Sequence, residues 1–197
     1  MEGLFGFVLA GIALLSSPGP ATMSLAAIGA AFGARRGFGY MAGIAMGMVI
    51  VMTVIATGVM GVLLALPGAA PVLTVLSSAY IVFLAYRIAT APPLAETSNQ
   101  HRQPSFIGGV FLSLVNPKAY AAVAALFSGF VLVKDHLPFD AALKIVILLT
   151  ILSITNAGWL FIGSALTRFT EKPRINRAIN VTFAVLLVVS VGLATLF

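Results

Sequence analysis

Leu114-Val115-Asn116-Pro117-Lys118-Ala119 lies in the middle of an apolar run that covers about residues 105–133. We interpret Lys118 as the only charged side chain deep inside any hydrophobic stretch of this chain. At the centre of a membrane-spanning helix a lysine costs about 2.5–3.5 kcal/mol on insertion scales, so its presence calls for a reason. Pro117 lacks an amide hydrogen and its ring clashes with the preceding turn, so a helix must break or kink there. The stretch therefore predicts a broken helix with an ammonium group at the break.

Asn116 and Pro117 are typical of the N-cap and the first position of a new half-helix. The amides of this half-helix, at the positive end of its dipole, would point into the membrane interior beside Lys118. This arrangement predicts an anion site. A structural alternative, in which Lys118 is a tether for carbonyls that the break sets free, stays open and is compatible with a role in a site.

The composition identifies the class of protein. Of the 197 residues, 60% are apolar and 8% are charged, which is typical of an integral membrane protein. The absence of cysteine excludes disulfides, thiolate metal sites and dithiol chemistry. The net charge of +6 could suggest a nucleic-acid partner, but the basic residues stand at the ends of apolar runs. A role in membrane topology is the better interpretation, and no cofactor is predicted.

The first apolar run, residues 4–32, is too long for one straight helix across a hydrocarbon core of about 30 Å. It is interrupted by Ser16-Ser17-Pro18-Gly19-Pro20. We expect Ser17 to be the N-cap and Pro18 the first helical residue of a second half-helix. The first span is therefore predicted to be broken at Pro18, as the fourth is at Pro117.

The chain is predicted to be an all-α membrane protein with six transmembrane helices in two three-helix repeats. The other expected spans are residues 39–66, 72–89, 141–166 and 179–196. A shift of 99 residues lays Asn116-Pro117 on Ser17-Pro18, which gives repeats over residues 1–90 and 105–197 and a cytoplasmic linker over 91–104. Three spans per repeat make the repeats inverted, and paired broken helices point to a midplane binding site. The alternative is that the two prolines merely kink two helices.

The basic residues predict the orientation of the chain. One side holds eight of them, namely Arg35, Arg36, Arg87, Arg102, Arg168, Lys172, Arg174 and Arg177. The other side holds Lys134 and Lys144 beside Asp135 and Asp140. The positive-inside rule makes the first side cytoplasmic and puts both termini outside.

Three groups of residues, at their spacing here, are typical of one known family. They are Pro18-Gly19-Pro20; Gly33-Ala34-Arg35-Arg36-Gly37 followed by Gly43 and Gly47; and Gly109 followed by Leu114-Val115-Asn116-Pro117-Lys118-Ala119. On these residues the chain resembles, along nearly its whole length, the LysE/RhtB family of amino-acid exporters (lysine/homoserine/threonine exporter-like). The resemblance implies efflux of amino acids or related metabolites across a bacterial cytoplasmic (inner) membrane, driven by the proton motive force, by a homodimer.

The chain departs from that family at positions that affect the substrate. Ala21 stands where many members have Asn, and Ser77 stands where many have Gly. Ala121 and Ala122 follow the second motif where a phenylalanine is frequent, which leaves more room. The substrate therefore cannot be carried over from any one relative.

An amino acid offers a carboxylate for Lys118 and the half-helix amides, and an ammonium for carbonyls at the breaks. The membrane interior is expected to hold no Asp or Glu, so a second positive charge on a substrate has no partner, and neutral substrates are favoured. The candidate substrate-binding residues are Ser17, Pro18, Gly19, Pro20, Thr22, Asn116, Pro117, Lys118 and Asn156. No catalytic or metal-binding residue is predicted. A membrane-embedded enzyme and a structural membrane protein are the alternative classes.

Overall fold

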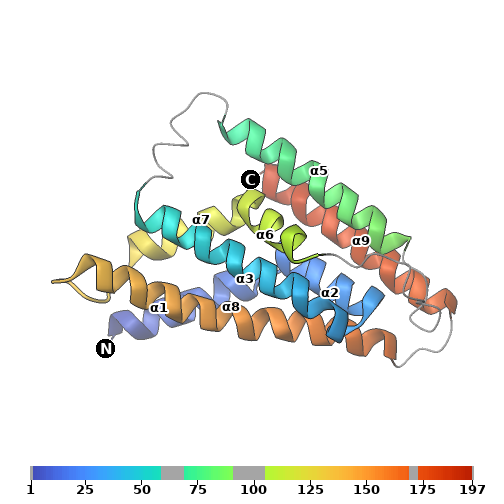
Figure 1. Ribbon diagram of the computed structural model, residues 1–197, viewed down its shortest axis with the longest axis horizontal. Coiled ribbons are helices and arrows are strands. Elements are labelled where there is room, and N and C mark those ends of the chain that lie inside the picture. Colours follow the sequence, from blue (N-terminus) through green and yellow to red (C-terminus); the bar gives the residue numbers. More distant parts are fainter. Residues whose placement is uncertain (1, 59–68, 91–104, 169–172, 197) are drawn as a thin grey trace.

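The computed structural model describes residues 2–58, 69–90, 105–168 and 173–196, and every regular element in these ranges is an α-helix (Figure 1). The helices are α1 (Glu2–Ser16), α2 (Pro20–Phe32), α3 (Ala34–Ala56), α5 (Ala69–Ala89), α6 (Phe106–Val115), α7 (Pro117–Gly129), α8 (Leu137–Arg168) and α9 (Pro173–Leu196). A broken pair, a long helix and a further helix follow one another twice along the chain.

The helices are long and apolar enough for a membrane protein. Ala34–Ala56 and Leu137–Leu166 each suffice to cross a bilayer alone. Gly3–Ser16 with Pro20–Phe32 and Phe106–Val115 with Pro117–Gly129 qualify as two further spans, bent by 56° and 64°. The described chain thus holds up to four candidate spans, and the apolar parts of α5 and α9 described here are shorter. The all-α membrane class and both helix breaks are confirmed, whereas the six-span inverted repeat stays a prediction.

The cap of the first break was predicted wrongly. Helix α1 ends at Ser16 and α2 begins at Pro20, so Pro18 lies in the break and Gly19 is the N-cap. Ser17 instead donates its hydroxyl to the carbonyl of Leu14 at 2.9 Å. Pro18 and Pro20 each suit the first position of a helix, where an amide hydrogen would have no partner and a proline has none. Thr22 decides between them, since its hydroxyl accepts the Gly19 amide at 2.9 Å.

The second break follows the prediction. Asn116 is the N-cap of α7, and its side-chain oxygen accepts the backbone amide of Lys118 at 3.1 Å. Pro117 occupies the first helical position.

The connection between the first two expected spans, residues 4–32 and 39–66, is shorter than their bounds imply. Only Gly33 separates α2 from α3, and its φ of 80° is a conformation that favours glycine. Ala34 already belongs to α3, and its amide donates to the Ser164 hydroxyl of α8 at 3.2 Å. Arg35 and Arg36 therefore stand in the first turn of α3. The predicted linker 91–104 and residues 59–68 lie outside the described residues.

Each long helix packs on the broken pair from the other half of the chain: α3 contacts α6 and α7, and α8 contacts α1 and α2. Glycines allow the backbones to approach. A Cβ on Gly43 would collide with the Phe106 carbonyl, and one on Gly163 with the Ala26 carbonyl. Gly47 also faces α6, whereas Gly39 has nothing within 4 Å.

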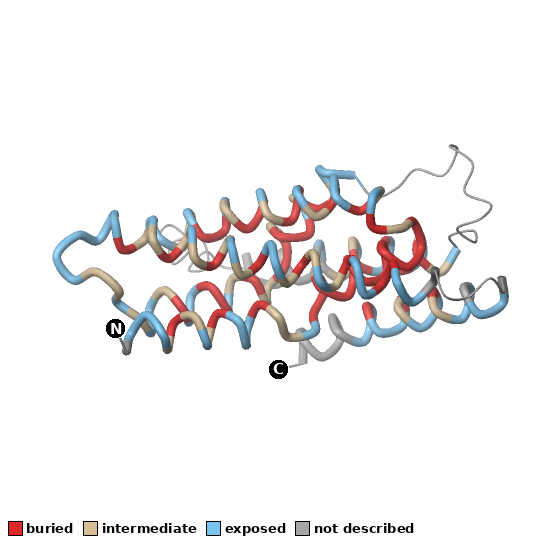
Figure 2. Tube along the Cα trace, turned by 90° about the horizontal axis from the view of Figure 1, so that it is seen from below, coloured by how far each residue is buried: buried red, intermediate tan, exposed pale blue. Residues whose placement is uncertain are grey.

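Figure 2 shows the buried residues along the inward faces of the helices. Helix α2 is buried at nearly every position, and Tyr40, Phe7 and Leu25 are among the largest fully buried side chains. Large apolar side chains such as Ile154 point outward, at 69% exposed, as expected of a surface that faces lipid.

The described arginines gather at one end of the bundle. The start of α3, the end of α5 and the start of α9 lie together at the right of Figure 1. These segments carry Arg35, Arg36, Arg87, Arg174 and Arg177. Arg102 and Lys172, which the sequence assigned to the same side, lie outside the described residues.

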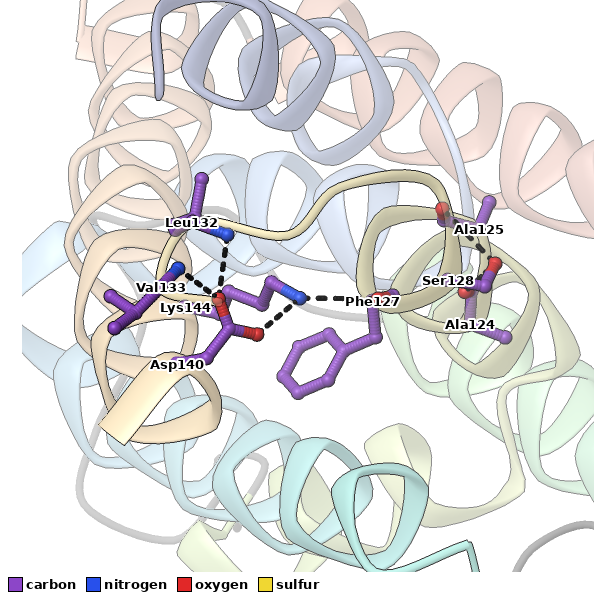
Figure 3. Close-up of polar contacts among 8 residues, drawn as sticks. All are labelled: Ala124, Ala125, Phe127, Ser128, Leu132, Val133, Asp140 and Lys144. Carbon is purple, nitrogen blue, oxygen red and sulfur yellow. Dashed lines mark hydrogen bonds and ion pairs between the residues drawn. The ribbon is translucent and has the colours of Figure 1, made fainter. Parts of the chain in front are cut away.

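Two charged side chains near the start of α8 are buried more fully than the half-buried Lys118. Lys144 is 3% exposed and Asp140 is 5% exposed, and their side chains pair at 2.6 Å within the first turns of α8 (Figure 3). Lys144 also donates to the Phe127 carbonyl near the end of α7 at 3.1 Å. Asp140 accepts the amides of Leu132 and Val133 at 2.6 and 2.9 Å. The pair therefore fastens the connection between α7 and α8.

Candidate functional site

Lys118 joins the two helix breaks. Its ammonium nitrogen lies 2.7 Å from the carbonyl oxygen of Ser17, 2.8 Å from the Ser17 hydroxyl and 3.0 Å from the carbonyl oxygen of Pro18. These three acceptors match the three hydrogens of a lysine ammonium. No carboxylate of the described chain lies within salt-bridge distance of it. The lysine from one half of the chain thus satisfies carbonyls freed in the other half.

Other carbonyls at the end of α1 are satisfied from α8. The Trp159 indole donates to the carbonyl of Ser16 at 3.3 Å, and the hydroxyls of Ser16 and Thr155 lie 3.2 Å apart. A helix end inside a membrane needs such partners, because hydrocarbon offers none. The first break is therefore held by side chains from both α7 and α8.

Gly19 gives Lys118 its place. A Cβ on Gly19 would lie 2.8 Å from both Cδ and Nζ of Lys118. The backbone there is extended, with φ −176°, so other residues could adopt this conformation. Glycine at this position leaves space for the lysine, which a larger residue would displace.

A cavity adjoins the breaks, with a volume of about 40 Å³ in which the centre of a water-sized group fits. One water needs about 10–15 Å³ by this measure, so the cavity has room for roughly three or four such groups. Its lining residues are Leu14, Leu15, Gly19, Pro20, Ala21, Thr22, Ile44, Met48, Ser113, Asn116, Lys118, Ala119, Ala122, Leu152 and Asn156. The cavity is thus polar around the breaks and apolar elsewhere.

The structure brings most of the predicted site residues together. Gly19, Pro20, Thr22, Asn116, Lys118 and Asn156 line the cavity. Ser17 and Pro18 contact Lys118 without lining the cavity, and Pro117 begins α7 beside it. Whether any of them binds a substrate stays a prediction.

The apolar residues that line the cavity are not predicted from the sequence. Ile44 and Met48 on α3 and Leu152 on α8 follow ordinary helical spacing, and nothing in the sequence distinguishes them from packing residues. Two of the departures from the family have a structural place: Ala21 and Ala122 both line the cavity, whereas Ala121 is exposed.

Asn156 differs from the other polar residues of the lining. It is 1% exposed, and neither its side-chain oxygen nor its side-chain nitrogen has a hydrogen-bond partner among the described residues. Thr22, Ser113 and Asn116 all bond to protein groups.

The chemistry available at this site is binding. An ammonium group, backbone carbonyls and an amide can hold a small polar molecule, and the described residues contain no cluster of three or more His, Asp or Glu side chains that could hold a metal ion. The Ser17 hydroxyl accepts a hydrogen bond from Lys118 and donates one to the Leu14 carbonyl. It would keep the second bond if Lys118 exchanged it for another acceptor.

The fold is that of an all-helical membrane protein, in which two broken helices meet at a small cavity with a polar end. The chain belongs to the LysE type translocator family, whose sequence profile matches residues 12–196. This family and the efflux proteins among the relatives identify a transporter and not an enzyme.

Two relatives illustrate the similarity. The chain is 29% identical over 172 residues to the cysteine/O-acetylserine efflux protein of Escherichia coli (strain K12), with 87% of each chain covered. It is 26% identical over 183 residues to a Vibrio cholerae protein named as an uncharacterized membrane protein, with 90% of this chain and 88% of the relative covered. No solved structure matches the chain.

Proposed function

We propose that this chain exports small neutral amino acids or related metabolites from a bacterial cytoplasm across the inner membrane, as a secondary transporter driven by the proton motive force. One observation carries the proposal: Lys118 bridges both helix breaks at the wall of a cavity. An ammonium held by neutral acceptors can exchange one of them for a substrate carboxylate, which is the stronger partner. The carbonyls of Ser17 and Pro18 then become acceptors for the substrate ammonium.

The preference for neutral substrates rests on the charges around the cavity. Its lining contains Lys118 and no carboxylate. A dibasic amino acid would bring a second positive charge to this site without an anionic partner, and burying an unpaired charge is costly. The Escherichia coli relative is named for cysteine and O-acetylserine, two small neutral amino acids, which supports the same class.

The proposed architecture has six spans in two inverted repeats, residues 1–90 and 105–197, joined by a cytoplasmic linker over 91–104. It is supported by the twofold succession of a broken pair, a long helix and a further helix. The gathering of arginines at one end of the bundle supports a cytoplasmic position for that end, with both termini outside. A homodimer is proposed from the family resemblance alone.

The orientation can be tested with single cysteines, because the chain has none of its own. We expect Ser98→Cys to react with a membrane-impermeant thiol reagent only after cell lysis. Labelling of this variant in intact cells would place the linker outside and reverse the orientation.

The transport function is tested by flux in proteoliposomes. Purified protein is reconstituted with radiolabelled serine or cysteine inside, and efflux is followed with and without an imposed pH gradient. We expect flux of neutral amino acids above protein-free liposomes, acceleration by the gradient and loss of this acceleration with a protonophore. Flux of lysine or arginine alone would contradict the neutral class, and flux insensitive to the gradient would contradict the proton coupling.

A further inference from the structure

Asn156 lies within α8 as a buried amide without a protein partner in the described chain. It is 1% exposed, and both polar atoms of its side chain lack a hydrogen bond. Such a group is costly to bury, because it has left water and gained nothing in exchange. Neighbouring polar side chains of α8 avoid this cost: Thr150 and Ser153 each donate to the carbonyl four residues earlier, at 2.8 and 2.7 Å.

Asn156 is one of the residues that line the cavity, on the same helix face as Leu152 four residues earlier. Asn156 and Lys118 come from different helices, α8 and α7, and both line this cavity. The residue whose amide lacks a partner therefore borders a cavity with room for a few water-sized groups.

The chemistry of an amide limits what it can pair with. Its oxygen accepts and its nitrogen donates, so a group that does both, such as a hydroxyl, satisfies it better than an ammonium, which only donates. If the ligand carried an apolar group instead of the hydroxyl, the side-chain oxygen and nitrogen of Asn156 would stay unpaired. A site with unpaired polar groups strongly rejects a ligand of this kind.

We infer that Asn156 is a specificity-determining residue, which pairs with a hydroxyl or a similarly small polar group on the side chain of the exported amino acid. This inference rests on the proposed function and narrows it to short, polar, neutral amino acids. In this arrangement Lys118 binds the carboxylate of the exported amino acid, and Asn156 binds the polar group of its side chain.

The test compares serine with 2-aminobutyrate, in which a methyl group replaces the hydroxyl at nearly the same size. In proteoliposomes, we expect the wild-type chain to transport serine with a kcat/KM at least about tenfold above that for 2-aminobutyrate, as a lost hydrogen bond to a buried amide requires. In Asn156→Leu this ratio falls to about one, because serine loses its partner while 2-aminobutyrate does not. The thermal stability of this variant stays at or above that of the wild type.

Asn180→Leu is the matched control. Asn180 in α9 is 3% exposed and its side-chain oxygen also lacks a partner in the described chain, but it does not line the cavity. We expect this variant to keep the wild-type ratio. Asn156→Ser, which retains a hydroxyl, serves if the leucine variant fails to insert, and it is expected to keep part of the preference.

The outcomes separate this inference from the proposed function. An unchanged ratio in Asn156→Leu, or an equal loss in Asn180→Leu, overturns the role of Asn156 while wild-type flux still supports amino-acid export. Equal transport of both probes by the wild type also overturns it, and identifies Asn156 as a group that water satisfies. Absence of any amino-acid flux in the wild type refutes the proposed function itself.

Discussion

Replacing Lys118 by Met separates the two roles that this lysine can have. Methionine keeps much of the volume of the side chain but has no donor, so the Lys118→Met variant loses the bridge between the breaks. If the ammonium also holds the substrate carboxylate, export falls about 10- to 100-fold, which corresponds to one hydrogen bond between charged groups.

The effect of this substitution on stability follows from the partners of the lysine. The Ser17 carbonyl keeps a hydrogen bond from the Thr22 hydroxyl at 3.4 Å, whereas the Pro18 carbonyl loses its only partner among the described residues. Pro18 is exposed, so the lost bond costs near the lower end of the usual range, about 1 kcal/mol. Membrane insertion in turn becomes easier by about 2.5–3.5 kcal/mol, because a charge no longer enters the membrane. We therefore expect normal or raised membrane abundance and a melting temperature lowered by about 2–4 °C.

The assay measures abundance, melting temperature and efflux per folded molecule on the same preparation. Gly19→Ala is the companion variant, because its Cβ displaces the ammonium while the charge remains; it should reduce efflux with little change in abundance. Binding of ethanolamine, which lacks a carboxylate, should not weaken in Lys118→Met, because this probe has no group for the lysine to hold and competes with it for the Ser17 and Pro18 carbonyls. Normal efflux per folded Lys118→Met molecule would refute the anion-site role and leave the lysine as a tether.

Two further predictions concern the packing and the second buried lysine. Gly43→Ala should destabilise the fold by about 1–3 kcal/mol, since its Cβ meets the Phe106 backbone, whereas Gly39→Ala should leave the melting temperature nearly unchanged. Equal effects of the two variants would show that the α3–α6 approach is not tight. Lys144→Met should cost about 3–5 kcal/mol because it leaves the Asp140 carboxylate buried without its ion partner, and adding Asp140→Asn should restore most of this loss in thermal unfolding. A double variant no more stable than Lys144→Met would contradict the ion-pair explanation.

The parts of the fold that the sequence predicts are those with local chemistry. The break at Asn116-Pro117 can be predicted because an N-cap residue followed by a proline specifies a helix start through local interactions alone. At the first break the local sequence is ambiguous, since Pro18 and Pro20 both suit a first position. A hydroxyl two residues after Pro20, that of Thr22, resolves the choice.

The buried pair Asp140 and Lys144 shows what a prediction from apolar runs alone does not find. Asp140 and Lys144 stand at the edge of the expected span 141–166, where charged residues usually face water, so the sequence assigns them only to one side of the membrane. Their spacing of four residues was the available signal for an ion pair on one helix face. Burial of this pair depends on the turn before α8 folding back over it, which no local pattern specifies.

The bridge formed by Lys118 also imposes an order on biosynthesis. Its partner Ser17 is 101 residues earlier in the chain, so at about 5–20 residues per second the first break is synthesised some 5–20 s before the lysine. During that time the Pro18 carbonyl needs water or the insertion machinery as a partner, because lipid cannot serve. The nascent first half of the chain therefore carries an unpaired polar group inside the membrane, and this group marks it as incomplete. Arrival of Lys118 removes this mark, and a chain truncated before residue 118 would keep it as a signal of incomplete assembly that membrane quality control can recognise.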